Sequence, residues 1–118
     1  MNKMYALGRL KTGEMNKTEQ AYRNTLELMR IAGEILWYRF EGIKLKLAEN
    51  TTYTPDFFVM RSSGEIEAHE VKGFAMDDSM VKVKVAAETF PFRFYIVRTR
   101  LKRDGGGWDI KEVGNGRS

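Results

Sequence analysis

The stretch from 57 to 72 constrains the fold most, because it has the pattern of two apolar strands joined by a tight turn. Residues 57–60 form a compact apolar run, and residues 61–64 (Arg-Ser-Ser-Gly) are typical of a hairpin turn. Residues 65–72 can then return beside the first strand, and Gly73 ends them. The sequence therefore predicts an antiparallel β-hairpin here.

A helix is predicted over residues 17–32. Asn16 is a suitable N-cap, and Glu19 three residues later completes a capping-box pattern. Apolar side chains then recur at helical spacing until Gly33, which favours a helix end. This helix precedes the hairpin in the chain.

The remaining segments predict further strands and a second helix. Residues 77–90 alternate in part like a strand, but Met80, Val83, Ala87 and Phe90 fit one helical face, which favours a helix. The other predicted elements are strands at 35–40, 43–47, 92–97 and 108–113, with turns at 49–51 and 104–107. The order of elements predicts an α/β fold in which helices flank a central mixed sheet. We expect residues 1–15 to form a flexible arm and residues 16–118 to form a single domain.

Composition limits the possible chemistry. The 118 residues include no cysteine and one histidine, which excludes disulfides, thiol nucleophiles and zinc sites rich in sulfur or nitrogen. A bound metal would have to be a hard cation held by carboxylates, such as Mg²⁺, Mn²⁺ or Ca²⁺. No apolar run approaches the length of a membrane span or has the form of a secretory signal, so we expect an intracellular protein. The formal charge of +4 favours a polyanionic partner.

Two acids and one lysine are expected to meet at the hairpin. Asp56 precedes the first strand and Glu70 lies near the end of the second, separated by the 13 residues from 57 to 69. Side chains two apart in a strand share a face, so Glu70 and Lys72 should point together while Val71 points into the core.

This trio suits phosphodiester hydrolysis. Two neighbouring carboxylates repel each other unless a divalent cation lies between them, and such an ion polarises a phosphoryl oxygen and activates a bound water. The ammonium of Lys72 can stabilise the charge of the transition state or orient the attacking water. No covalent intermediate is needed.

The pattern Pro55-Asp56 … Glu70-Val71-Lys72 resembles the signature of the PD-(D/E)XK nuclease superfamily. The resemblance implies a restriction-endonuclease-like core with a helix-borne acid, which Glu19 would match. It implies that Asp56, Glu70 and Glu19 bind Mg²⁺ (or Mn²⁺). Within the superfamily, the chain looks like small phage-encoded nucleases related to Holliday-junction resolvases, which implies a homodimer acting on branched or otherwise distorted DNA.

Each of these residues also has a simpler interpretation. Asp56 follows a proline and is typical of a turn, Glu19 is explained by helix capping, and Glu70 and Lys72 could be partners on an exposed strand. The single histidine, His69, should face away from Glu70 and Lys72, so we expect it to be structural.

Positive charge is dense after the hairpin, and beside a phosphodiesterase site it favours contacts with the DNA backbone. The glycines at 105–107 lack the Lys-Ser/Thr ending of a phosphate-binding loop, and we interpret them as a hairpin loop. No helix-turn-helix pattern is present, so recognition of DNA shape is favoured over a long specific sequence. The candidate DNA-binding residues are Lys82, Lys84, Arg93, Arg98, Arg100, Lys102 and Arg103.

Two other functions stay open. A catalytically inactive, basic DNA-binding module of the same fold would bind DNA in a salt-dependent way without cutting it. A basic accessory protein would instead bind protein partners through exposed aromatic side chains and have no affinity for DNA at moderate salt. The hydrolytic hypothesis is preferred because acid, acid and lysine are all present.

Overall fold

The computed structural model describes residues 13–73 and 79–114. Within these residues, two helices and seven strands follow one another, together with one 3-10 helix. They are α1 (Lys17–Ile31), β1 (Ile35–Phe40), β2 (Leu45–Ala48), β3 (Thr51–Tyr53), β4 (Phe57–Arg61), β5 (Ile66–Lys72), α2 (Ser79–Thr89), β6 (Arg93–Thr99), η2 (Lys102–Asp104) and β7 (Trp108–Val113). Residues 1–12 of the arm predicted at 1–15, and the predicted helix start at 77–78, lie outside the described residues.

The central sheet has five strands in the order β1-β4-β5-β6-β7. Neighbouring strands in this sheet are antiparallel, except for β5 and β6, which run parallel. A parallel pair requires a crossover connection, and α2 lies in the segment that joins these two strands. The expectation of an α/β fold with a mixed sheet and two helices is confirmed.

Local sequence explains where α1 begins and ends. The Asn16 side chain accepts a hydrogen bond from the Glu19 backbone nitrogen at 2.8 Å, and the Glu19 side chain accepts one from the Asn16 nitrogen at 2.9 Å. This is the predicted capping box. Gly33 follows the helix with a φ of 83°, a backbone conformation that glycine adopts without strain.

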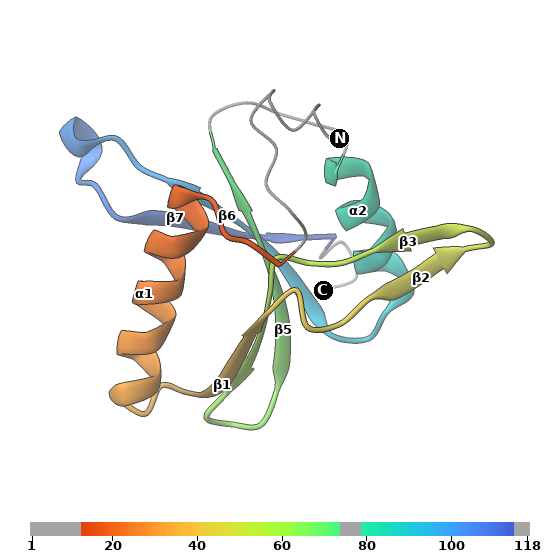
Figure 1. Ribbon diagram of the computed structural model, residues 1–118, viewed down its shortest axis with the longest axis horizontal. Coiled ribbons are helices and arrows are strands. Elements are labelled where there is room, and N and C mark those ends of the chain that lie inside the picture. Colours follow the sequence, from red (N-terminus) through yellow and green to blue (C-terminus); the bar gives the residue numbers. More distant parts are fainter. Residues whose placement is uncertain (1–12, 74–78, 115–118) are drawn as a thin grey trace.

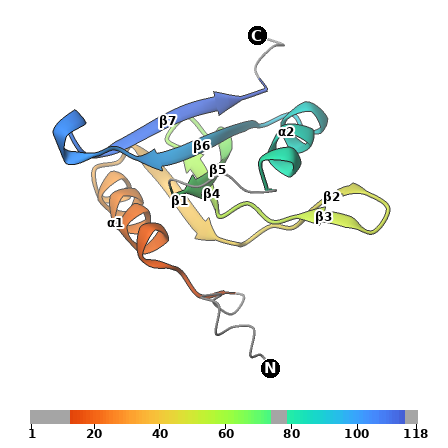
Figure 2. The same cartoon turned by 90° about the horizontal axis from the view of Figure 1, so that it is seen from above.

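The helices cover opposite faces of the sheet, which makes three layers (Figures 1 and 2). Successive residues of β4 alternate between the two cores, as the strand period requires. Phe57 and Val59 pack with Tyr22 of α1, whereas Phe58 packs with Val83 of α2. The prediction of a helix over residues 77–90 is therefore confirmed within the described residues.

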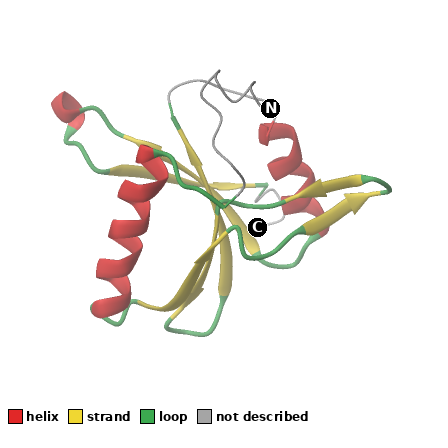
Figure 3. Cartoon of the chain, viewed as in Figure 1, coloured by secondary structure: helices red, strands yellow, loops and turns green. Residues whose placement is uncertain are grey.

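The β2–β3 hairpin was only partly predicted. A strand was expected at 43–47 and a turn at 49–51, but the structure has a separate two-stranded sheet of β2 and β3 that projects from the central sheet (Figure 3). The second strand has three residues and is too short to show a clear alternation. Lys82 of α2 donates a hydrogen bond to the Thr52 carbonyl at 3.0 Å, which holds the hairpin against that helix.

In the part of the chain that the structure describes, no helix is both long and apolar enough to cross a membrane.

Candidate active site

The β4–β5 hairpin brings Asp56 and Glu70 together. Phe57 is directly opposite His69 in the ladder, so Asp56, one residue earlier, lies opposite Glu70. The Asp56 backbone nitrogen donates to Glu70 Oε1 at 3.4 Å, and the Val71 nitrogen donates to Asp56 Oδ2 at 2.8 Å. The two carboxyl groups therefore meet at the end of the hairpin, as the spacing predicts.

Lys72 joins this pair from the same face of β5. Its Nζ lies 3.7 Å from Glu70 Oε2. Only 7% of Glu70 and 4% of Lys72 is exposed to solvent, so the interpretation of an exposed surface pair is wrong. Val71 points to the other face and packs in the core beneath α1, as predicted.

A third contact to Glu70 comes from Tyr53, which the sequence analysis missed. The Tyr53 hydroxyl donates to Glu70 Oε1 at 2.6 Å from the end of β3. Burial, followed by the charge of Glu70, raises the pKa of Tyr53, so the phenol stays protonated and donates. The contact depends on how the β2–β3 hairpin folds back, which no local pattern around Tyr53 indicates.

Glu19 lies next to the site and acts on the Asp56 carboxyl group. Burial raises the pKa of Asp56 to about 9, and the charges of Glu70 and Glu19 and a hydrogen bond with Glu19 act in the same direction, against the Val71 backbone nitrogen. Glu19 therefore lies close enough to Asp56 for its charge to act on that carboxyl group. Glu19 thus has both the capping role and a place beside Asp56.

These acids fit a hard cation in part. Among the described residues, no group of three or more histidine, aspartate or glutamate side chains is arranged to hold a metal ion. Asp56 and Glu70 alone provide two carboxylates at one point, and Mg²⁺ is commonly bound by one or two carboxylates with water and substrate phosphate as the other ligands. The donor chemistry therefore fits magnesium or manganese, with Glu19 next to the pair.

His69 lies on the opposite face of β5, as expected. The Tyr22 hydroxyl is 2.7 Å from His69 Nδ1, and His69 Nε2 is 2.9 Å from Glu67 Oε1. Arg61 Nε lies 3.6 Å from the other Glu67 oxygen. Burial acts to raise the pKa of Glu67, but the hydrogen bond from His69 and the charge of Arg61 outweigh it and leave the pKa lowered.

These contacts assign the tautomer of His69. An ionised Glu67 can only accept, so Nε2 carries the proton that it donates to the carboxylate. In the neutral ring, Nδ1 then accepts from the Tyr22 hydroxyl, whose pKa is raised by burial and then by the charge of Glu67. This buried chain joins α1 to the strand that carries Glu70.

The candidate DNA-binding residues divide into two groups. Arg98 is directly beside Lys72 in the parallel ladder, and its guanidinium donates to the Gly73 carbonyl at 3.3 Å. Lys84 is exposed on α2, and Lys82 contacts the Thr52 carbonyl. Arg98 is therefore the basic residue of this set that the sheet brings next to the acids and lysine.

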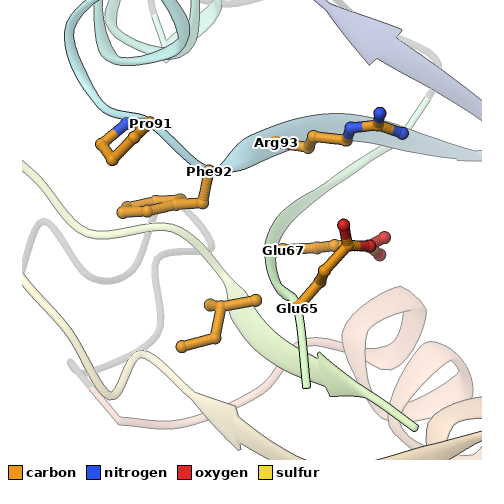
Figure 4. Close-up of a pocket in the computed structure, with 6 residues that line it drawn as sticks. Glu65, Glu67, Pro91, Phe92 and Arg93 are labelled. Atoms are coloured by element: carbon orange, nitrogen blue, oxygen red, sulfur yellow. The ribbon is translucent and has the colours of Figure 1, made fainter. Parts of the chain in front are cut away.

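The other four basic residues lie elsewhere. Arg93, at the opposite end of β6, lines a cavity of about 170 Å³ with Glu65 and Glu67 (Figure 4). Its Nε lies 3.7 Å from Glu112 Oε2. The Arg100 guanidinium donates to the Trp108 carbonyl at 2.7 Å. Lys102 and Arg103 are exposed in η2, at the tip of the β6–β7 connection.

Comparison with known proteins identified no relative of this chain: no protein-family model, no curated protein and no solved structure matches it.

Proposed function

We propose that this chain is a metal-dependent endonuclease that hydrolyses DNA phosphodiester bonds, with a restriction-endonuclease-like core and a PD-(D/E)XK site. The observation that carries the proposal is the convergence of Asp56, Glu70 and Lys72 at one buried point. Burying charged side chains costs several kcal/mol unless they are well paired, and perturbed carboxyl groups cluster at functional sites. The raised pKa of Asp56 is such a perturbation.

The residues divide the work of hydrolysis as follows. Asp56 and Glu70 provide the carboxylates for Mg²⁺ or Mn²⁺, which when bound polarises the phosphoryl oxygen and acidifies a water. Tyr53 fixes Glu70 Oε1 while Lys72 faces Oε2, so the carboxylate cannot rotate freely. Lys72 orients the attacking water and stabilises negative charge on the phosphate as the phosphorus–oxygen bond to the leaving group breaks.

Glu19 has a supporting role in this proposal. Its charge acts on Asp56 in the metal-free protein, and with a cation bound it would add negative charge near the metal. Glu19→Gln keeps the hydrogen-bonding capacity of the cap and removes that charge. We expect this variant to fold, to bind the cation more weakly and to cut more slowly.

Nicking of supercoiled plasmid tests the proposal. We expect product with Mg²⁺ and none with EDTA, and at least a hundredfold loss in Asp56→Asn and Lys72→Met. Asp104→Asn, on the exposed η2, is the matched control and should cut normally. Circular dichroism separates loss of activity from loss of fold. Full activity in folded Asp56→Asn, or product in EDTA, would overturn the site assignment.

A DNA-binding module that does not cut is the second candidate. It is favoured by one observation, that no three metal-ligating side chains are grouped in the described residues. It predicts salt-dependent DNA binding with no product at any Mg²⁺ or Mn²⁺ concentration. A four-way junction, a nicked duplex and an intact duplex, compared side by side, would also test the expected preference for distorted DNA.

The resemblance further implies that the chain acts as a homodimer, and we keep this as part of the proposal. Light scattering of the purified chain measures it directly. A monomer at the concentration that gives full cleavage would remove the dimer from the proposal and leave the site unaffected.

A further inference from the structure

A cavity of about 310 Å³ opens between the first turn of α2 and strands β6 and β7. Its volume lies within the range of small-ligand sites. Three of the side chains that line it are apolar and three are charged. They are Met80, Ile96, Val113, Arg98, Asp109 and Lys111.

The ladder places this cavity beside the candidate active site. Arg98 lies directly beside Lys72 on β5, and Ile96, which is next to Glu70, is directly opposite Lys111 on β7. Directly paired residues share a face of a sheet, so Arg98 and Lys111 point to the same face as Glu70 and Lys72. Strands are about 4.8 Å apart, which puts the two cations roughly 5–10 Å from β5.

The charge of the cavity matches one phosphodiester. Arg98 and Lys111 each carry one positive charge and Asp109 one negative charge, so the formal sum is +1. Lys111 is exposed, and none of the ion pairs within the described ranges 13–73 and 79–114 includes it. A guanidinium and an ammonium are the groups that contact nucleic-acid phosphates most often.

We infer that Arg98 and Lys111 hold a second, unreacted phosphodiester of the DNA strand that is cut at Asp56, Glu70 and Lys72. Successive phosphates of one strand are about 3.4 Å apart along the helix axis, so a phosphate a few nucleotides from the reacting one reaches the cavity. The inference rests on the proposed function. It adds Lys111, which the sequence analysis did not select, and assigns Arg98 to this subsite.

Binding measured without cleavage tests the subsite. Fluorescence anisotropy of a labelled DNA duplex in EDTA gives the affinity at several salt concentrations for the wild type, Lys111→Ala and Arg23→Ala. Arg23 is exposed on α1, at the other face of the sheet, and its substitution removes the same charge. We expect Lys111→Ala to lower the slope of log affinity against log salt by about 0.9, the value for one phosphate contact, and Arg23→Ala to leave it unchanged.

Uncharged phosphates provide the second arm. We compare duplexes that each carry one methylphosphonate with the unmodified duplex. At one position near the cut, the methylphosphonate should lower the affinity of the wild type and leave the affinity of Lys111→Ala unchanged. Equal slopes for Lys111→Ala and Arg23→Ala, or the absence of such a methylphosphonate position, would overturn the subsite. Metal-dependent cleavage by the wild type would in that case still support the nuclease. A wild type that neither binds nor cuts DNA would overturn both.

Discussion

Replacing Asp56 with asparagine should remove much of the fall in stability that the metal-free protein shows as pH rises. The substitution removes the titrating proton and keeps the size of the side chain. The asparagine carbonyl oxygen can still accept the hydrogen bond that the Val71 nitrogen donates to Asp56 Oδ2. The difference between the two proteins therefore reports the titration of Asp56 more than a loss of packing.

The sign follows from proton linkage. The folded pKa of Asp56 is raised to about 9, chiefly by burial and then by Glu70 and Glu19, whereas an aspartate in the unfolded chain titrates near 4. Between these values the folded state binds more protons than the unfolded state, so the free energy of unfolding falls as pH rises. One proton changes it by about 1.4 kcal/mol per pH unit, which gives at most about 4 kcal/mol between pH 5 and 8. Because Asp56 is partly exposed and solvent screens part of the effect, we expect about 2–4 kcal/mol.

Urea denaturation in EDTA measures this directly. The free energy of unfolding of the wild type should fall between pH 5 and 8 by about 2–4 kcal/mol more than that of Asp56→Asn. The control Asp104→Asn changes an exposed aspartate of η2 and should follow the wild type. Parallel pH curves for the wild type and Asp56→Asn would refute the assignment of a partly buried, protonated carboxyl group at this position.

Three further predictions concern the contacts around the site. Added Mg²⁺ should raise the melting temperature of the wild type more at pH 8 than at pH 5, because protonated carboxyl groups do not bind the cation. It should change the melting temperature of Asp56→Asn little. Equal shifts in both proteins would show that the cation binds elsewhere. Tyr53→Phe removes the hydroxyl that donates to Glu70, so plasmid nicking should need a higher Mg²⁺ concentration, whereas Tyr38→Phe, which loses a more exposed hydroxyl, should not change that requirement. Tyr22→Phe leaves buried His69 Nδ1 without its donor and should lower the free energy of unfolding by about 1–3 kcal/mol in urea titrations, and an unchanged midpoint would contradict the hydrogen bond.

Elements with strong local signals could be predicted from sequence. The capping box at Asn16 and Glu19 and the apolar period after it define α1 within one residue of the expected end. The separation of Glu70 and Lys72 from His69 follows from strand alternation alone. These features depend on neighbours within four residues in the chain, where pattern and structure correspond closely.

Features that depend on distant segments could not be predicted. Tyr53 meets Glu70 because β3 ends beside β5, and β3 is too short to have a recognisable period. The arrangement of the basic residues depends on which strands become neighbours, so the sequence cluster from Arg93 to Arg103 is spread along the sheet and its β6–β7 connection. The raised pKa of Asp56 depends first on burial, which composition and spacing do not measure.

Strand β5 is polar and buried on both of its sides, which limits how its length can be changed. Glu67 and His69 meet Tyr22 and Arg61 on one side, while Glu70 and Lys72 meet each other and Tyr53 on the other. Displacement by one residue would exchange the two sets, leaving an imidazole in the place of Glu70 and a carboxylate in the place of Val71, in the apolar core beneath α1. Laboratory variants should therefore accept an added residue in the turn at 62–65, and lose both fold and activity when one is added between 67 and 72.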